Sequence, residues 1–293
     1  MCLFTCLLVY SFTCLLVYSF TTMFLPENID LAHSEKYNLS IRLASNGFSF
    51  CIYCPSDPTV FHFQETSLGN KLSHVESVKK LIFDFGFFSQ AFKETVVTIV
   101  SPHYTLVPDV FFEKKRAKDL FEFNFHEVGT TVLTNQLEEL DCHILFSIDE
   151  TLHSFLSRHL WNPTFRHPIT PLLAFFHRYE ADSDKKRCFV DFHHHDKSIS
   201  VICFSAKNKL LSANTFPIAT THDVSYFVAS VWEKGGFDQT EDGLYFSGNV
   251  EWYESGILKK LIKNVEIIEL KSKVLLEVKQ KKAMPTDVLV NLI

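Results

Sequence analysis

The sequence predicts a mixed α/β protein made of two copies of one unit, each with the order strand, strand, strand, helix, strand, helix, strand. Two observations support this prediction. Runs rich in β-branched and aromatic residues occur in groups of three, and the same order of elements recurs in the second half of the chain. Hydrophobic residues make up 46% of the chain, which is enough for a full core, and the 30 phenylalanines predict a core dominated by ring packing.

The first unit is expected over residues 37–180. It opens with the strand-like runs YNLSIRLASN, GFSFCIYCPSD and TVFHFQETSL, and Asn46-Gly47 and Pro55–Pro58 separate them as hairpin turns do. The next stretch, SHVESVKKLIFDFGFFSQAF, has apolar residues at helical spacing, and Ser73 precedes them in the position of a cap. The run ETVVTIVSP then predicts a buried strand.

Extra material is expected inside the first unit, as an insertion at about residues 102–140 that begins with a charged helix. The elements expected from there to the second unit are a helix near Pro108–Leu120, strands at Thr130–Asn135 and Cys142–Asp149, and helices at Glu150–Leu160 and Ile169–Tyr179. The insertion therefore separates the first four strands of the unit from its last elements.

The second unit is expected over residues 186–293. The runs RCFVDFHHHD, SISVICFSAK and KLLSANTFPI predict three strands joined by tight turns. The stretch THDVSYFVASVWEKGG predicts a helix that ends at Gly235-Gly236, and GLYFSGNV predicts the next strand. A further helix, YESGILKKLIKN, and a further strand, VEIIEL, complete the repeat.

The first residues contain an exact tandem repeat, because the octamer TCLLVYSF occurs at Thr5–Phe12 and again at Thr13–Phe20. Residues 1–22 have three interpretations: a mis-called start that reads translated repeat DNA, a membrane anchor, or a secretory signal. A secretory signal needs a basic start, and the chain has no Lys or Arg before Lys36. We expect translation to begin at Met23, with residues 23–36 as a lead-in to the first strand.

Composition excludes several classes of function. A net charge of −6 and an isoelectric point near 6.2 argue against a general nucleic-acid binder, which needs a basic face. Neither GxGxxG nor GxxxxGK occurs. The CxxC formed by Cys51 and Cys54 lies in a strand-like run, where positions three apart face opposite sides, so we interpret these cysteines as core thiols. Core thiols suit a reducing compartment, and the expected localisation is cytoplasmic.

The duplicated order of elements resembles the ribonuclease-H-like fold, which occurs twice in actin-like ATPases. In those ATPases a glycine-rich hairpin in each half binds the ATP phosphates, and an Asp beside it manages the metal and the attacking water. In VDFHHHDKSISVI, Asp191 is in the position of that Asp, and His193, His194 and His195 are in the positions of the glycines. In the first half Arg42 is near the Asp position. Imidazoles would block the close approach of backbone to phosphate that glycine allows.

One further turn resembles the family pattern. Ser247, Gly248 and Asn249, in LYFSGNV, resemble the strand-to-helix turn that meets the nucleoside in actin-like ATPases. Together with Asp191 and the three histidines, this turn marks a vestigial nucleotide cleft. The resemblance therefore implies the fold, no catalytic residues and no cofactor, with ATP-Mg as the alternative.

Two shorter segments narrow the resemblance. YTLVPDVFF at Tyr104–Phe112 and AMPTDVLVNLI at Ala283–Ile293, with the duplicated order of elements, resemble the uncharacterised bacterial family called domain of unknown function 3822. That family resembles the actin-like components of pilus and secretion platforms and the actin-like division ATPase. The resemblance implies a fold rather than a chemistry.

The histidine cluster and a basic stretch are two candidate binding sites. His193–His195 with Asp196 form a candidate metal site. At most His193 and His195 face the same side of a strand, so a further ligand would have to come from elsewhere, such as His222 or Asp223. We therefore expect no metal site, and interpret the cluster as a solvated turn or a pH-sensitive contact. The stretch FFEKKRAKDLFEF is interpreted as a solvated helix face, with a membrane-surface or partner helix as the alternative.

The sequence thus predicts a non-catalytic actin-like scaffold or regulatory protein. The alternatives are a weak ATP-binding actin-like ATPase and, if residues 1–22 are part of the protein, a membrane-anchored component of an assembly platform. The expected partner is a protein, which could be a second copy of the chain, and not a nucleic acid. The hairpins at Ala44–Gly47 and His193–Asp196 are expected to face each other across a groove with no site shaped for a triphosphate.

Overall fold

The computed structural model describes residues 25–69, 71–179, 184–193, 196–250, 256–274, 276 and 284–292. The predictions for the repeat in residues 1–22, and for His194 and His195, lie outside these residues. Among the described helices, none is both long and apolar enough to cross a membrane.

The first sheet has five strands in the order β3-β2-β1-β4-β8. The strands are β1 Asn38–Leu43, β2 Gly47–Cys54, β3 Asp57–Ser67, β4 Glu94–Ile99 and β8 Pro163–Arg166. Strands β1, β2 and β3 pair antiparallel through the two predicted hairpins, whereas β4 and β8 run parallel to β1. This arrangement is the mixed sheet predicted for the first unit.

The second sheet repeats the first in order and direction, as β11-β10-β9-β12-β13. Its strands are β9 Arg187–His193, β10 Ser198–Phe204, β11 Leu210–Pro217, β12 Gly243–Gly248 and β13 Asn264–Ile267. Strands β9, β10 and β11 pair antiparallel, and β12 and β13 run parallel to β9. The prediction of two ribonuclease-H-like halves is therefore confirmed.

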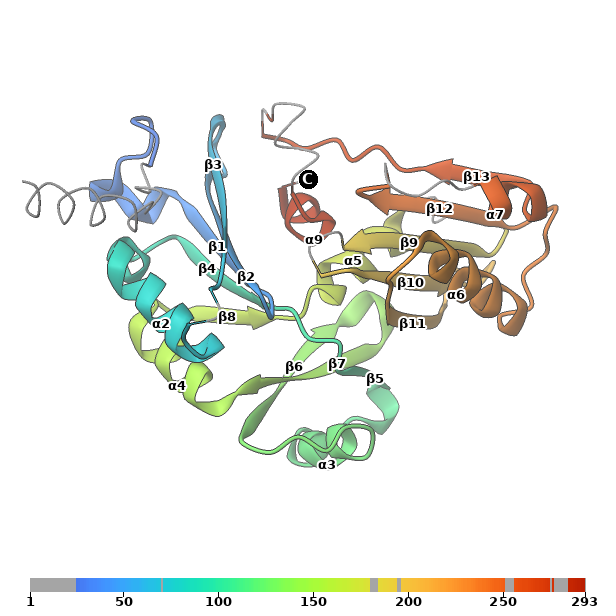
Figure 1. Ribbon diagram of the computed structural model, residues 1–293, viewed down its shortest axis with the longest axis horizontal. Helices are drawn as coiled ribbons and strands as arrows, with labels where there is room; N and C mark the ends of the chain where they lie inside the picture. The colour runs from blue at the N-terminus through green and yellow to red at the C-terminus, as the bar shows by residue number, and fades with distance from the viewer. Residues whose placement is uncertain are drawn as a thin grey trace, which may run out of the picture.

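The helices complete the symmetry of the two halves. They are α2 His74–Phe85, α4 Glu150–His159, α5 Ile169–Arg178, α6 Thr221–Lys234, α7 Gly256–Leu261 and α9 Thr286–Leu289. Short 3-10 turns are η1 Leu31–Lys36, η2 Phe87–Ser89, η3 Asp109–Phe111, η4 Lys114–Arg116, η5 Glu138–Leu140 and η6 Val290–Leu292. Helices α2 and α4 cover the outer side of the first sheet, and α6 and α7 that of the second, whereas α5 and α9 lie between the sheets (Figure 1).

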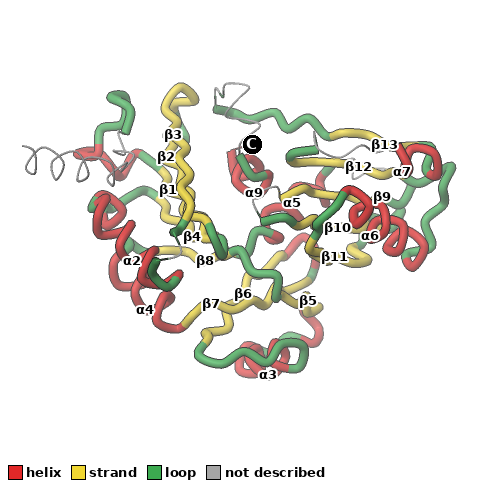
Figure 2. The backbone as a smooth tube through the Cα atoms, in the orientation of Figure 1, coloured by secondary structure: helices red, strands yellow, loops and turns green. Residues whose placement is uncertain are grey.

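The inserted segment forms a third sheet of its own, with strand order β5-β7-β6 (Figure 2). Its elements are β5 Tyr104–Pro108, β6 Thr130–Leu137, β7 Cys142–Asp149 and the helix α3 Ala117–Glu122. Two predictions need correction here. The insertion reaches Asp149 rather than about residue 140, because β7 pairs with β5 and β6 and not with the first sheet. The fifth strand of the first sheet is β8, which the sequence analysis did not predict.

Phenylalanines dominate the core, as their number predicts. In the first half the ring of Phe88 lies 5.7 Å from that of Phe48 and 5.3 Å from that of Phe50, both edge to face. Between the halves, Phe176 of α5 stacks on Phe189 of β9 at 4.6 Å. Such pairs add about 0.5–1.5 kcal/mol each to the stabilisation from burial. The two halves therefore share one continuous core through α5.

Replacing Ser73 with alanine is expected to lower the free energy of unfolding by about 1 kcal/mol. The hydroxyl of Ser73 accepts from the backbone N–H of Glu76, whose carboxylate accepts from the N–H of Ser73, so the substitution removes half of a capping box. Urea unfolding measures the change. Ser73→Asp, which keeps an acceptor at the cap, should match the unsubstituted protein, and equal losses in both variants would contradict the capping role.

Candidate functional site

Arg42 of the first sheet and Asp191 of the second sheet are in equivalent positions. Arg42 pairs with Ser49 of β2 and with Thr98 of β4. Asp191 has the corresponding neighbours, Ser200 of β10 and Ser247 of β12. The pairing within the two sheets therefore relates a guanidinium in one half to a carboxylate in the other.

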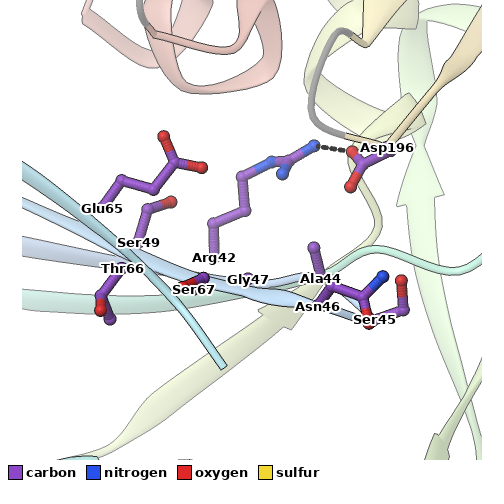
Figure 3. Close-up of a pocket in the computed structure, with 10 residues that line it drawn as sticks. All are labelled: Arg42, Ala44, Ser45, Asn46, Gly47, Ser49, Glu65, Thr66, Ser67 and Asp196. Atoms are coloured by element: carbon purple, nitrogen blue, oxygen red, sulfur yellow. Dashed lines mark hydrogen bonds and ion pairs between the residues drawn. The ribbon is translucent and has the colours of Figure 1, made fainter. Parts of the chain in front are cut away.

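Arg42 forms a buried ionic cluster with two aspartates. Its Nε lies 3.0 Å and 3.2 Å from the carboxylate oxygens of Asp287, and its Nη2 lies 2.8 Å from Oδ2 of Asp196. Figure 3 shows the guanidinium extending from the first sheet toward Asp196. The exposed side-chain fractions of Arg42 and Asp287 are 5% and 1%, so this contact is largely removed from water. The cluster joins β1, the hairpin between β9 and β10, and α9.

Burial and charge oppose one another within the cluster. Burial raises the pKa of Asp287, although the charge of Arg42 acts to lower it. Burial acts to lower the pKa of Arg42, but the carboxylates of Asp287 and Asp196 outweigh it and raise that pKa. Each charge thus depends on the others to remain ionised inside the protein.

Asp191 and His193 begin a chain of polar contacts across the second sheet. Asp191 is fully buried, and one of its oxygens accepts from the Ser247 hydroxyl at 2.6 Å. The other oxygen lies 3.5 Å from Nδ1 of His193. Nε2 of His193 lies 2.8 Å from the hydroxyl of Ser200, which lies 2.9 Å from the hydroxyl of Thr215. One oxygen of the carboxylate predicted for the nucleotide cleft is therefore held by Ser247, whereas the other is buried without a hydrogen-bond partner among the described residues.

The chain of contacts continues into the inserted sheet. The hydroxyl of Thr215 donates to that of Tyr104 at 3.3 Å, and the Tyr104 ring lies 4.6 Å from the ring of His167. Nδ1 of His167 accepts from the backbone N–H of Ile169, so Nε2 carries the proton and donates to the carbonyl of Ser101 at 2.8 Å. Burial lowers the pKa of His167 to about 3. His167 is thus neutral at physiological pH.

A cavity of about 400 Å³ lies between the two halves. It is lined by Ser45 from the hairpin of the first half and by His193 and Asp196 from that of the second, and His167 contributes to its wall. A second cavity, of about 270 Å³, is also lined by Arg42 and Asp196, together with Ala44 and Gly47 of the first hairpin (Figure 3). Both hairpins therefore reach the space between the halves, as the duplication predicts.

The turn that resembles a nucleoside site is closely packed. Gly248 has φ +78°, and a Cβ there would lie 2.5 Å from the carbonyl oxygen of Phe192 and 3.2 Å from the hydroxyl of Thr286. Glycine is required by both the backbone conformation and the contact. Thr286, at the start of α9, thus lies against the turn Ser247-Gly248-Asn249.

The structure identifies site residues that the sequence analysis missed: Asp196 and Asp287 as ion partners, His167, and Tyr104. One indication was present, because Asp287 is the only charged residue in the apolar segment AMPTDVLVNLI. Within the described part of the chain, no three His, Cys, Asp or Glu side chains are grouped so that they could hold a metal. Asp223, weighed as a ligand, instead accepts from the backbone N–H groups of Ala219 and Thr220.

Comparison with known proteins identifies the fold. A protein of Bacteroides thetaiotaomicron, described as having an actin-like ATPase fold and unknown function, superposes with a TM-score of 0.72 at 30% identity, over 82% of this chain and 93% of that chain. A chain of the PilM–PilN type IV pilus biogenesis complex superposes with a TM-score of 0.55 at 10% identity, over 87% of this chain and 96% of that chain, which shows a shared fold. No curated protein sequence matches. Residues 26–265 match the family model described as protein of unknown function (DUF3822), and the chain belongs to this family.

Proposed function

We propose that the protein is a non-catalytic actin-like scaffold, whose two halves are held together by its own side chains and whose surface binds a protein partner. The cluster of Arg42 with Asp287 and Asp196 carries the proposal. In this cluster the chain supplies two anions to the cation that faces the cleft. A phosphate would have to displace them at the cost of leaving a carboxylate unpaired.

The charges around the cleft also disfavour a triphosphate. Asp196 and Asp287 contact a single guanidinium, and the charge of Asp191 acts on Asp287, so the carboxylates outnumber the cation. The hairpin between β9 and β10 reads His193, His194, His195, Asp196, Lys197 and contains no glycine. Phosphates are normally held by backbone N–H groups in glycine-rich turns, and this hairpin lacks the residue type that allows them to approach.

We propose that the partner is a protein, because a protein with this fold is found in a complex with another protein. One structure with this fold is that of the PilM–PilN type IV pilus biogenesis complex. The partner could equally be a second copy of the chain. We propose that it is met in the cytoplasm, since the described cysteines are all free thiols. A membrane-anchored assembly component is the alternative that depends on residues 1–22.

A second candidate function is weak ATP binding. Asp191 keeps the position of the family carboxylate, and the cavity of about 400 Å³ between the halves has the size of a small-molecule site. In that case the ionic cluster would open on binding and the cleft would alternate between open and closed forms. The two functions differ in whether nucleotide binds at all.

Purified protein is expected to neither bind nor hydrolyse ATP-Mg, because the anion sites of the cleft are already filled by carboxylates. Titration calorimetry measures binding, and phosphate release over hours measures turnover. The variant Asp191→Asn serves as the control for contaminating ATPases. Saturable binding or turnover that disappears in Asp191→Asn would replace the scaffold with the ATP-binding alternative.

A further inference from the structure

Cys188 of β9 and Cys203 of β10 form a pair of thiols on the outer side of the second sheet. They are direct cross-strand partners, and their Sγ atoms are 3.7 Å apart. Both side chains are buried, with exposed fractions of 0% and 1%, in the apolar cluster that includes the inner side of α6. Both are free thiols, so the pair is in its reduced form.

The geometry of the pair is compatible with a disulfide. An S–S bond is about 2.05 Å long, so the sulfur atoms would have to approach by about 1.7 Å. Direct partners in antiparallel strands have Cα atoms about 4.5–5.5 Å apart, which is within the range that disulfides span. The register of β10 against β11 shifts just after Cys203, and such an irregularity gives this end of β10 more freedom to adjust.

The chemical surroundings distinguish Cys203 from two other buried thiols, Cys51 and Cys142. A hydrogen bond with Cys188 lowers the pKa of Cys203, and one with Ser212 acts in the same direction against the effect of burial. Burial raises the pKa of Cys51 to about 12 and that of Cys142 to about 11. Because the thiolate is the reactive form, Cys203 is better placed to attack an oxidant than Cys51 or Cys142.

We propose that Cys188 and Cys203 form a reversible two-electron redox site that reacts with small hydroperoxides. The Cys203 thiolate attacks one peroxide oxygen and becomes a sulfenic acid, and the other oxygen leaves as hydroxide and takes up a proton. The Cys188 sulfur then attacks the sulfenic sulfur, and the hydroxyl leaves as water. With hydrogen peroxide, two thiols are oxidised to one disulfide and the peroxide is reduced to two molecules of water.

The disulfide would act on the strands that carry the cleft residues. Side chains alternate along β9, so Cys188 faces α6 whereas Asp191 and His193 face the other side of the sheet. The bond would join β9 to β10 at the ends away from the hairpin that bears Asp196. Oxidation is therefore expected to raise the melting temperature of the protein, and a dithiol reductant should reverse the change.

The test is peptide mapping of the full chain, reduced first and then treated with hydrogen peroxide. Trypsin cuts after Arg187, Lys197 and Lys207, so the two cysteines fall in separate peptides, 188–197 and 198–207. We expect these peptides to appear joined, at a mass lower by two hydrogens than their sum, and to separate after treatment with dithiothreitol. The thiols of Cys51 and Cys142 should remain available to iodoacetamide after denaturation.

Variants test the site separately from the fold. Cys203→Ala should abolish both the joined peptide and the peroxide-dependent rise in melting temperature, whereas Cys142→Ala, at another buried thiol, should preserve both. The mapping of the unsubstituted chain remains decisive if a variant does not fold. Free alkylated Cys188 and Cys203 after peroxide treatment, or a sulfinic acid in place of the joined peptide, would overturn the proposal.

Discussion

Replacing Arg42 with methionine is expected to lower the free energy of unfolding by about 3–5 kcal/mol. Methionine keeps much of the side-chain volume but leaves Asp287, which is 1% exposed, without its counter-charge. Removing one member of a buried ion pair is costly because the remaining charge stays out of water. Urea unfolding followed by circular dichroism measures the loss.

The pH dependence of this loss is a further part of the prediction. Without Arg42 the pKa of Asp287, which burial already raises, rises further. The folded variant therefore keeps a proton on Asp287, whereas the unfolded chain releases this proton above the usual aspartate pKa of about 3.8. The stability deficit should therefore grow with pH, and be larger at roughly pH 8 than at roughly pH 5. Adding Asp287→Asn to the variant should recover much of the loss.

A surface pair provides the matched control. Lys80 lies 2.5 Å from Asp84 on α2, and both side chains are well exposed. Lys80→Met should cost less than about 1 kcal/mol, because exposed pairs are solvated whether or not they meet. Similar small losses for Arg42→Met and Lys80→Met would show that the cluster does not hold the two halves together.

Acidification is expected to destabilise the protein through His167. The pKa of His167 is about 3 in the folded protein and 6.5 as a free side chain, since burial disfavours the charged ring. Between these values the unfolded chain binds a proton that the folded protein does not, so stability falls as pH falls. The slope from this one residue is about 1.4 kcal/mol per pH unit.

The variant His167→Gln isolates this contribution. A glutamine amide can donate to the Ser101 carbonyl as the imidazole does, but it does not titrate. Between roughly pH 4 and pH 6, the unfolding free energy of the variant should change less steeply with pH than that of the unsubstituted protein. The difference in slope corresponds to about one bound proton. The raised pKa of Asp287 makes an opposite contribution to the pH dependence of stability. This contribution is the same in both proteins and cancels in the comparison. Parallel curves would mean that His167 is protonated in the folded state.

Local patterns were sufficient to predict much of the fold. The hairpins, the cap at Ser73 and the helix end at Gly235 depend on residues within a few positions of one another. The strand β8 was missed because PTFR is four residues long, contains a proline and lies between two helices. Its only strand character comes from pairing with β4, which precedes it by many residues.

The site could be predicted only in part, because some of its residues meet through contacts between distant parts of the chain. Arg42 and Asp191 follow from the repeat, because equivalent strands place equivalent positions on the same side of a sheet. Asp287 does not, since nothing near it in the sequence indicates a cation 245 residues away. His167 was missed because its burial depends on packing between α5 and the inserted sheet.

The distance in sequence between Arg42 and Asp287 also sets an order of events during synthesis. The ribosome adds about 5–20 residues each second, so Asp287 is made on the order of 10–50 s after Arg42. Until Asp196 is made, 154 residues after Arg42, the guanidinium lacks both carboxylates, and until Asp287 is made it lacks one, so it must stay hydrated. The halves can therefore close on one another only as a late step, when the segment bearing Asp287 has been made and inserts between them.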